Sequence, residues 1–205
     1  MGAREQGREL RLQRIVDAAR ACFAEHGFAG TTVEAIAVRA EVSNGLLYKH
    51  FQGKEHLFQA VVGDIVRDWV RALVPAEAEA LSPTQKLEAM LRRSVAFCRT
   101  NPLLPAVLSG DKRFELARIG NPERGRVHAH RQLIASVLAD GIAKGEFRSD
   151  LEVDAMADVI QLIHAEYASR AYRNDPEFPY DDALVDAAVR FIRDAVVAER
   201  GGELG

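Results

Sequence analysis

The chain has 205 residues, of which 48% are hydrophobic, and this is enough to bury a core in one large domain or two modest ones. Its formal net charge of −3 excludes a uniformly basic protein that coats nucleic acid, so any DNA contact has to come from a local patch. No apolar run reaches the length of a membrane-spanning helix, and arginines interrupt the start of the chain where a leader would be apolar. We therefore expect a cytoplasmic protein.

The first fifty residues contain three helical patterns. Apolar residues from Ile15 to Phe23 form one helical stripe, and Gly27 is placed to end that helix in a left-handed cap. Thr31 and Glu34 have the spacing of a capping box for a second helix, which runs to about residue 40. After a turn at 41–43, Ser43 is the expected N-cap of a third helix from about Asn44 to His50. Two short helices joined by a tight turn form a helix-turn-helix.

The rest of the chain also shows helical spacing. A long fourth helix starts at Gly53 and has a broad apolar face as far as Leu73. Further helices are expected at about 84–100, 103–110, 124–143, 152–173 and 181–198. The predicted fold is all-α with about nine helices, comprising a three-helix head over 1–52 and a larger helical body over 53–205. Cys22 and Cys98 both fall in helical apolar stretches, so we expect buried, reduced thiols.

Several spaced motifs in the first sixty residues resemble one known family. They are Arg14-Ile15-Val16 through Phe23, Gly27-Phe28-Ala29-Gly30-Thr31-Thr32-Val33, Ser43-Asn44-Gly45-Leu46-Leu47-Tyr48-Lys49-His50-Phe51 and Gly53-Lys54-Glu55-His56-Leu57-Phe58. Together, over roughly residues 10–62, they resemble the signature of the TetR family of transcriptional regulators. The resemblance implies a homodimer that binds a double-stranded DNA operator and, as a repressor, is released from it by a small, largely apolar effector. Whether the protein represses or activates depends on where the operator lies, so an activator stays open.

The resemblance also implies roles for residues of the head. Contacts to the DNA backbone would come from Thr32, Ser43, Tyr48 and Lys54, with His50 bordering a phosphate. Helix starts suit such contacts because their free N–H groups and positive dipole attract phosphate.

Base reading would fall to the outward face of the third helix, which carries Asn44, Leu46 and Lys49. Asparagine pairs with adenine, lysine with guanine, and an exposed leucine rests on a thymine methyl. Leu46 has an alternative, in which it packs against the head and leaves specificity to its two polar neighbours.

Some residues of the head permit two interpretations. In an arbitrary helix Tyr48 would be a core aromatic and Lys49 a solvated charge, but the surrounding motif favours DNA contact for both. Four arginines near the start either form an arm that reaches the minor groove or lie on a solvated helix face with Glu5 and Glu9. They are Arg4, Arg8, Arg11 and Arg14.

The last two predicted helices are apolar on more than one side. Such a helix has to bury two faces, and one of them can pair with a second copy in a four-helix bundle, as the resemblance implies. The alternative is that both faces belong to the core of one chain. The candidate interface residues are Val159, Leu162, Ile163, Leu184, Val185, Ala188, Phe191 and Ile192.

The other helices of the body are expected to surround an effector pocket, again by resemblance. Candidate lining residues are Trp69, Phe97, Cys98, Leu108, Phe114, His130, Ile134, His164 and Tyr167. His130 and His164 are polar groups among apolar positions and need a partner, either a ligand or a neighbouring carbonyl.

Other kinds of site find little support in the sequence. His128 and His130 point different ways on one helix, so we expect no metal site, and we expect no cofactor. The sequence has no nucleophile–base–orienter set and no phosphate-binding glycine loop, so we do not expect an enzyme. A rival function keeps the fold but acts as a DNA-binding adaptor through protein partners, with no small-molecule effector.

Overall fold

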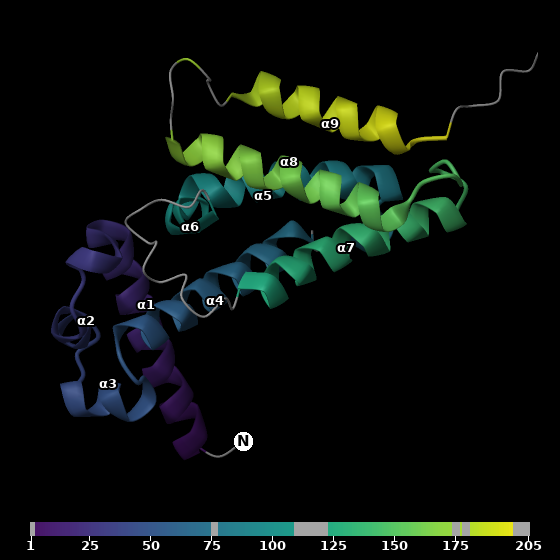
Figure 1. The fold of residues 1–205 in the computed structure, drawn as a ribbon. Helices are drawn as coiled ribbons and strands as arrows, with labels where there is room; N and C mark the ends of the chain where they lie inside the picture. Colours follow the sequence, from purple (N-terminus) through teal and green to yellow (C-terminus); the bar gives the residue numbers. More distant parts are fainter. Residues whose placement is uncertain (1–2, 75–77, 109–122, 174–176, 178–180, 199–205) are drawn as a thin grey trace, which may run out of the picture. The chain divides into compact units, whose positions relative to one another are not determined.

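The computed structural model describes residues 3–74, 78–108, 123–173, 177 and 181–198. These residues form nine α-helices, one 3₁₀ turn and no strand, which confirms the predicted all-α fold (Figure 1). The helices are α1 (Ala3–Gly30), α2 (Val33–Arg39), α3 (Asn44–His50), α4 (Lys54–Leu73), α5 (Pro83–Thr100), α6 (Leu103–Leu108), α7 (Glu123–Ala143), α8 (Val153–Arg173) and α9 (Asp182–Val196). None of the helices in these ranges is both long and apolar enough to span a bilayer.

The contacts between residues divide the chain into two compact units. The first unit holds α1 to α3, α4 as far as Arg67, and α6, which packs against α1. The second unit begins at Asp68 and holds the end of α4 together with α5, α7, α8 and α9. The division therefore falls inside α4, whereas the expected limit of the head was residue 52.

An aromatic cluster forms the core of the first unit. The Phe23 ring lies edge-on to the Phe58 ring at 4.9 Å, and Phe28 contacts both rings at 5.9 and 5.4 Å. These three side chains come together because α1 is interrupted at Gly27, where φ is 69° and ψ is 178°. Only glycine adopts this conformation readily. The predicted interruption at Gly27 is confirmed, but the chain makes one more helical turn after it instead of ending in a left-handed cap.

The start of α2 differs from the expected capping box. Thr31 is buried, and its hydroxyl donates to the carbonyls of Gly27 and Cys22 at 2.7 and 3.0 Å. Thr32 is the N-cap instead, because its hydroxyl oxygen accepts from the Ala35 N–H at 3.1 Å. The carbonyls exposed by the interruption at Gly27 thus draw Thr31 inward and shift the cap by one residue.

The turn between α2 and α3 contains a strained residue that is held by α1. Glu41 has a φ of 55°, a left-handed conformation that costs a residue other than glycine on the order of 1 kcal/mol. The Arg14 guanidinium donates to the Ala40 carbonyl at 2.9 Å and to the Glu41 carboxylate at 3.0 Å. Arg14 therefore braces the helix-turn-helix, and it extends from a helix rather than from an arm.

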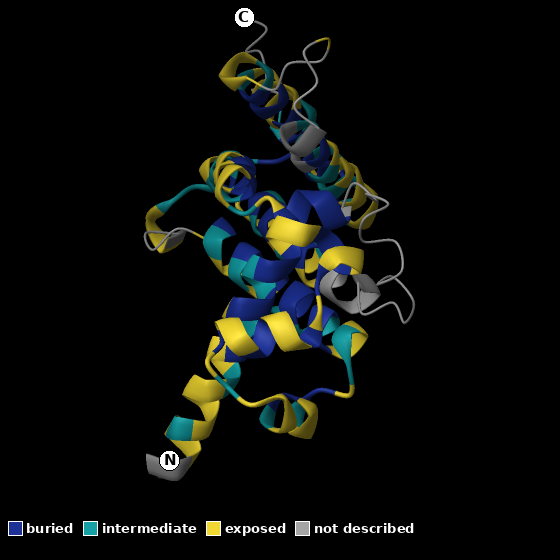
Figure 2. Ribbon diagram, turned by 90° about the vertical axis from the view of Figure 1, so that its left-hand side faces the viewer, coloured by how far each residue is buried: buried dark blue, intermediate teal, exposed yellow. Residues whose placement is uncertain are grey.

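The second unit is a bundle in which α5 packs against α7, α8 and α9 and α7 packs against α8. Figure 2 shows the pattern expected of such packing, in which helices carry a buried stripe and an exposed stripe. Leu91, Ile134 and Leu138 are fully buried in this bundle. Cys98 is also buried and, like Cys22 in the first unit, is a free thiol, which confirms that prediction.

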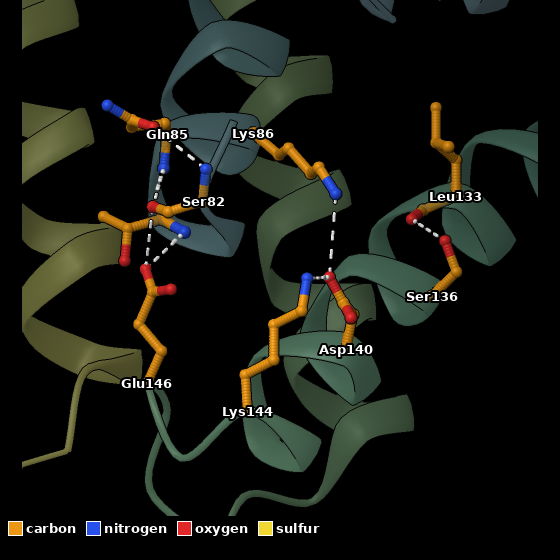
Figure 3. Close-up of polar contacts among 9 residues, drawn as sticks. Ser82, Gln85, Lys86, Leu133, Ser136, Asp140, Lys144 and Glu146 are labelled. Atoms are coloured by element: carbon orange, nitrogen blue, oxygen red, sulfur yellow. Dashed lines mark hydrogen bonds and ion pairs between the residues drawn. The ribbon is translucent and has the colours of Figure 1, made fainter. Parts of the chain in front are cut away.

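A carboxylate links the loop after α7 to the start of α5 (Figure 3). One oxygen of Glu146 accepts from the Ser82 hydroxyl at 3.0 Å and from the Thr84 backbone N–H at 2.9 Å. Burial alone would raise the pKa of Glu146, but the hydrogen bonds from Thr84 and Ser82 outweigh burial and leave this pKa below its ordinary value. Nearby, Asp140 pairs with Lys86 and Lys144 at 3.6 and 2.8 Å. These contacts hold the start of α5 against the end of α7 and the loop that follows it.

Candidate functional site

Helix α3 presents most of its side chains to solvent. Leu47 is fully buried, as predicted, and holds the helix to the first unit. Ser43 is the N-cap, accepting from the Leu46 N–H at 3.2 Å, so its hydroxyl proton stays free to donate outward. Asn44 and Lys49 are exposed, and Tyr48 exposes 52% of its surface despite being a large aromatic. One face of a seven-residue helix therefore offers polar groups to a partner.

A groove connects this face to the start of α1. It is lined by Arg8 and Arg11 from α1 and by Leu46, Lys49 and His50 from α3. Arg8, Arg11 and Lys49 are exposed, which concentrates three fixed positive charges on a chain whose net charge is negative. The groove is thus suited to a polyanion.

Leu46 lies half-buried in the wall of this groove and can touch both the protein and a bound partner. Arg8 lies on a continuous helix from Ala3, and so does Arg11. The helix-face interpretation of the arginines therefore holds for this part of the chain.

Lys54 and Thr32 lie away from the groove lining but close to each other in the first unit. The Lys54 ammonium donates to the Thr31 carbonyl at 3.0 Å and lies 4.6 Å from the centre of the Phe28 ring. The hydrogen bond to Thr31 uses one of the three N–H groups of the ammonium, which leaves two N–H groups. Lys54 therefore stabilises the first unit and still has N–H groups for a phosphate.

The candidate interface residues on α8 and α9 separate into two groups. Val159, Leu162 and Phe191 are exposed by 44, 69 and 63%, an unusual exposure for large apolar side chains. Ile163 and Leu184 are half-buried.

Three other candidates on α9 were placed wrongly by the sequence. Val185, Ala188 and Ile192 are each at most 6% exposed within a single chain. Ile192 lines a small hollow with Leu87 and Leu91 of α5, because this side of α9 packs on α5. Such residues have almost no surface left for a second chain, so they belong to the protomer's own core.

Three of the candidate pocket residues form a buried polar cluster with Ser94, here called the Trp–His cluster. Its members are Trp69 of α4, Ser94 of α5, His130 of α7 and His164 of α8. The Trp69 indole N–H donates to the Ser94 hydroxyl at 3.0 Å, and the Trp69 ring lies 4.4 Å from the His130 ring. His130 Nε2 and His164 Nδ1 are 3.0 Å apart and share one hydrogen bond. One partner of each histidine is therefore the other histidine, which the sequence did not suggest.

Burial governs the protonation of these groups. It lowers the pKa of His130 to about 4, and burial followed by the proximity of His130 lowers the pKa of His164 well below its ordinary value. Both rings are therefore neutral at physiological pH. Burial also raises the pKa of the Cys98 thiol to about 12, so this group acts as a small apolar side chain.

The remaining pocket candidates do not form one continuous wall in the described residues. Ile134 is fully buried, Phe97 is half-buried, and the Tyr167 hydroxyl donates to the Leu184 carbonyl at 3.0 Å, which connects α8 to α9. Phe114 and the side chain of Leu108 lie outside the described residues. The ranges that are described contain no group of three His, Cys, Asp or Glu side chains arranged to hold a metal ion.

Sequence reasoning did not include two residues that the structure brings to these sites. Ser94 had no distinguishing signal, since it is one serine within an apolar stretch of α5. Gln161 lies three residues before His164 on α8, and this spacing would have placed both on one helix face.

Comparison with known proteins agrees with this arrangement. Residues 15–61, which span the helix-turn-helix and the start of α4, match the family model described as "Bacterial regulatory proteins, tetR family". The chain is 30% identical over 143 residues to the HTH-type transcriptional repressor KstR of Mycolicibacterium smegmatis, covering 68% of this chain and 67% of KstR. It is 29% identical over 152 residues to KstR2 of the same organism, covering 70% and 71%.

Solved structures show the same fold. FadR of Bacillus subtilis, determined in complex with stearoyl-CoA, superposes with a TM-score of 0.74 at 21% identity, covering 90% of this chain and 98% of FadR. FadR of Bacillus halodurans superposes with a TM-score of 0.72 at 22% identity, covering 89% and 97%. The matched proteins are regulators of transcription and not enzymes, in agreement with the sequence. The chain therefore belongs to the TetR family of bacterial, DNA-binding transcriptional regulators.

Proposed function

We propose that this protein is a homodimeric repressor that binds a palindromic operator and is released from it by a small, largely apolar effector. The observation that carries the proposal is the groove of α1 and α3, where Arg8, Arg11 and Lys49 surround the exposed face of α3. The relatives in the sequence comparison are named repressors, which supports the same sign of regulation. We take residues 1–52 as the DNA-binding domain and residues 53–205 as the effector-binding and dimerisation domain.

In this proposal the side chains of the head divide into two sets. Phosphates are held by hydroxyl, imidazole and ammonium groups on and beside α3, which set the position of the protein on the duplex but read no sequence. Bases are read in the major groove by the exposed face of α3. The phosphate set is Thr32, Ser43, Tyr48, His50 and Lys54, and the base-reading set is Asn44, Leu46 and Lys49.

Arg8 and Arg11 extend this surface beyond the set expected from the sequence. Both are exposed on α1 and line the same groove as Lys49 and His50. We assign them to phosphates next to the bases that α3 reads. An arginine on a helix is positioned by its backbone, whereas an arginine on a flexible arm has to be ordered when DNA binds.

One such head makes too few contacts for a specific site, so two heads have to bind together. We assign the contact with the second chain to the exposed apolar residues Val159, Leu162 and Phe191 of α8 and α9, together with the half-buried Ile163 and Leu184. A twofold dimer then reads two half-sites about 34 Å apart, or a multiple of that spacing.

We assign the effector site to the second unit, at the Trp–His cluster. Four helices meet there, and B. subtilis FadR, which has the same fold, binds stearoyl-CoA. Because Trp69 lies on α4, and α4 also carries Lys54, an effector that shifts Trp69 would act on a helix shared with the DNA surface. The response is only as large as the effector's difference in affinity for the two states. The other candidate pocket residues, Phe97, Cys98, Ile134 and Tyr167, are assigned to the surroundings of this site, together with Leu108 and Phe114.

The proposal predicts different effects for two lysines of the head. Lys49→Ala is expected to relax preference at one base pair, at a cost of about 1–3 kcal/mol on the best operator. Lys54→Ala is expected to weaken binding to all sequences alike and to lower the slope of log K against log salt by about one. DNA footprinting at two salt concentrations, on the DNA that flanks the protein's own gene, measures both.

Because Lys54 also contacts Thr31 and Phe28, its variant needs a stability control. Lys54→Met keeps an apolar side chain that can pack near the Phe28 ring but loses the charge and the hydrogen bond to Thr31, so it should show the same salt slope as Lys54→Ala with less loss of stability. Absence of any sequence-preferring DNA binding by the wild-type protein would refute the proposed function.

A second prediction concerns Trp69. Trp69→Phe keeps a ring beside His130 but loses the hydrogen bond to Ser94, so it is expected to change release by effector at least about fivefold and operator affinity less than twofold. The measurement is operator binding by fluorescence anisotropy, with and without a compound that releases the wild-type dimer in a library screen. Weakened DNA binding with unchanged release would exclude coupling through Trp69.

A further inference from the structure

Two buried polar atoms on α8 lack a hydrogen-bond partner among the residues that the structure describes. They are the side-chain oxygen Oε1 of Gln161 and the ring nitrogen Nε2 of His164, which is only 2% exposed. The two residues are three positions apart on a helix, so they project from the same face. Buried polar groups are nearly always paired in proteins, so two unpaired atoms on one face of α8 mark a candidate position for contact with a bound molecule.

What that molecule has to offer depends on which histidine donates the hydrogen bond that the two rings share. Gln161 Oε1 can only accept a hydrogen bond. If His130 Nε2–H donates to His164 Nδ1, the proton of His164 is on Nε2, which then donates outward. The two open atoms are then one acceptor and one donor. A single hydroxyl group satisfies both, because its oxygen accepts from His164 and its proton goes to Gln161.

The side chains around the two histidines also disfavour a charged ligand. Burial keeps His130 and His164 neutral, so neither ring provides a cation for a carboxylate or a phosphate. Arg131, the residue next to His130, is already engaged by Asp154 and Asp158 at 3.0 and 2.5 Å. None of these three side chains therefore offers a counter-ion to an ionised ligand, and an ion without one is strongly disfavoured in a buried site.

We propose that Gln161 and His164 bind the hydroxyl group of a neutral, largely apolar effector, an alcohol rather than a carboxylic acid. The inference rests on the proposed function, because it names the chemical class of the effector of the same Trp–His cluster. It distinguishes this chain from a regulator whose ligand is an anion, such as the stearoyl-CoA bound to FadR.

Three small probes of matched size test the proposal on the full-length protein at pH 7.5. They are 1-octanol, its isomer 1-methoxyheptane, which accepts but cannot donate a hydrogen bond, and octanoate, which is charged. 1-Octanol is expected to raise the Tm and to bind about tenfold more tightly than the ether, while octanoate is expected to leave the Tm unchanged. Tighter binding of octanoate, equal binding of the two isomers, or no binding of 1-octanol would each overturn the proposal.

Variants locate the effect. Gln161→Leu removes the unpaired acceptor, so it is expected to weaken the binding of 1-octanol about tenfold and to leave the binding of 1-methoxyheptane unchanged. The Tm of the free variant is expected to equal or exceed that of the wild-type protein. The last result separates a ligand site from a structural role, since loss of a structural hydrogen bond lowers the Tm. Gln132→Leu makes the same change at an exposed position of α7 and should not affect either probe. If Gln161→Leu binds 1-octanol as the wild type does, the proposal is wrong.

Binding of the operator is measured in parallel on the same samples. Normal operator binding without selectivity for the alcohol would reject this inference and leave the DNA-binding function intact. That outcome would agree with a water molecule between Gln161 and His164, or with an adaptor that has no small-molecule effector.

Discussion

The double variant Leu162→Glu, Phe191→Glu is expected to be a monomer that binds the operator at least about 100-fold more weakly than the wild-type protein. Both side chains are more than 60% exposed in the single chain, so glutamate at these positions causes no strain within the protomer. In the dimer it would place four like-charged carboxylates in an apolar interface. The second half-site contact is then no longer intramolecular, and its contribution to affinity is lost.

The measurements are sedimentation velocity for the oligomeric state, thermal unfolding for the protomer, and anisotropy for the operator. Gln132→Glu, Ser136→Glu is the matched control, since it adds two negative charges to the exposed face of α7. That control should remain dimeric and bind DNA normally. A dimeric Leu162→Glu, Phe191→Glu protein would show that α8 and α9 use these faces for something other than self-association.

Acid is expected to destabilise the protein through the Trp–His cluster. Because burial lowers the pKa of His130 to about 4, from 6.5 in the unfolded chain, the unfolded state takes up more protons than the folded state as the pH falls. The free energy of unfolding is therefore at its full value above pH 6.5, where His130 is neutral in both states. It falls as the pH is lowered from 6.5 to about 4. For His130 alone the loss is on the order of 3 kcal/mol, and His164 adds to it in the same direction.

Urea unfolding at pH 7.0, 5.5 and 4.5 measures this loss. The variant His130→Asn, His164→Asn cannot titrate at these positions, so it should be less stable at pH 7 but should lose less free energy of unfolding on acidification. His26→Gln, at an exposed position, is the control and should follow the wild type. Equal pH dependence in the wild-type protein and the double variant would mean that other groups determine the acid sensitivity.

Much of the fold was predictable because helices are specified by nearby residues. Ser43 caps α3 by a bond to the N–H three residues later, and α3 begins at Asn44 and ends at His50 as expected. A cap is decided locally, however, only when no other partner competes for the side chain. At Thr31 the carbonyls of Gly27 and Cys22 compete, so the cap shifted to Thr32.

The candidate sites were less predictable than the helices. The exposed residues of α3 followed directly from the single buried position Leu47. The approach of Arg8 and Arg11 to Lys49 did not, since it depends on how α1 packs in the first unit. Likewise, no local pattern indicates that His130 and His164, which are 34 positions apart, share a hydrogen bond.

By itself the sequence determined the helical class, the helix-turn-helix and the family, because these depend on spacing and capping within a few residues. Only the tertiary structure decided which side of each helix is used. On α9, Ile192 faces α5 while its neighbour Phe191 faces solvent, although both read as apolar. The physical reason is that an apolar residue specifies burial but not its partner, and the partner is chosen by packing between distant segments.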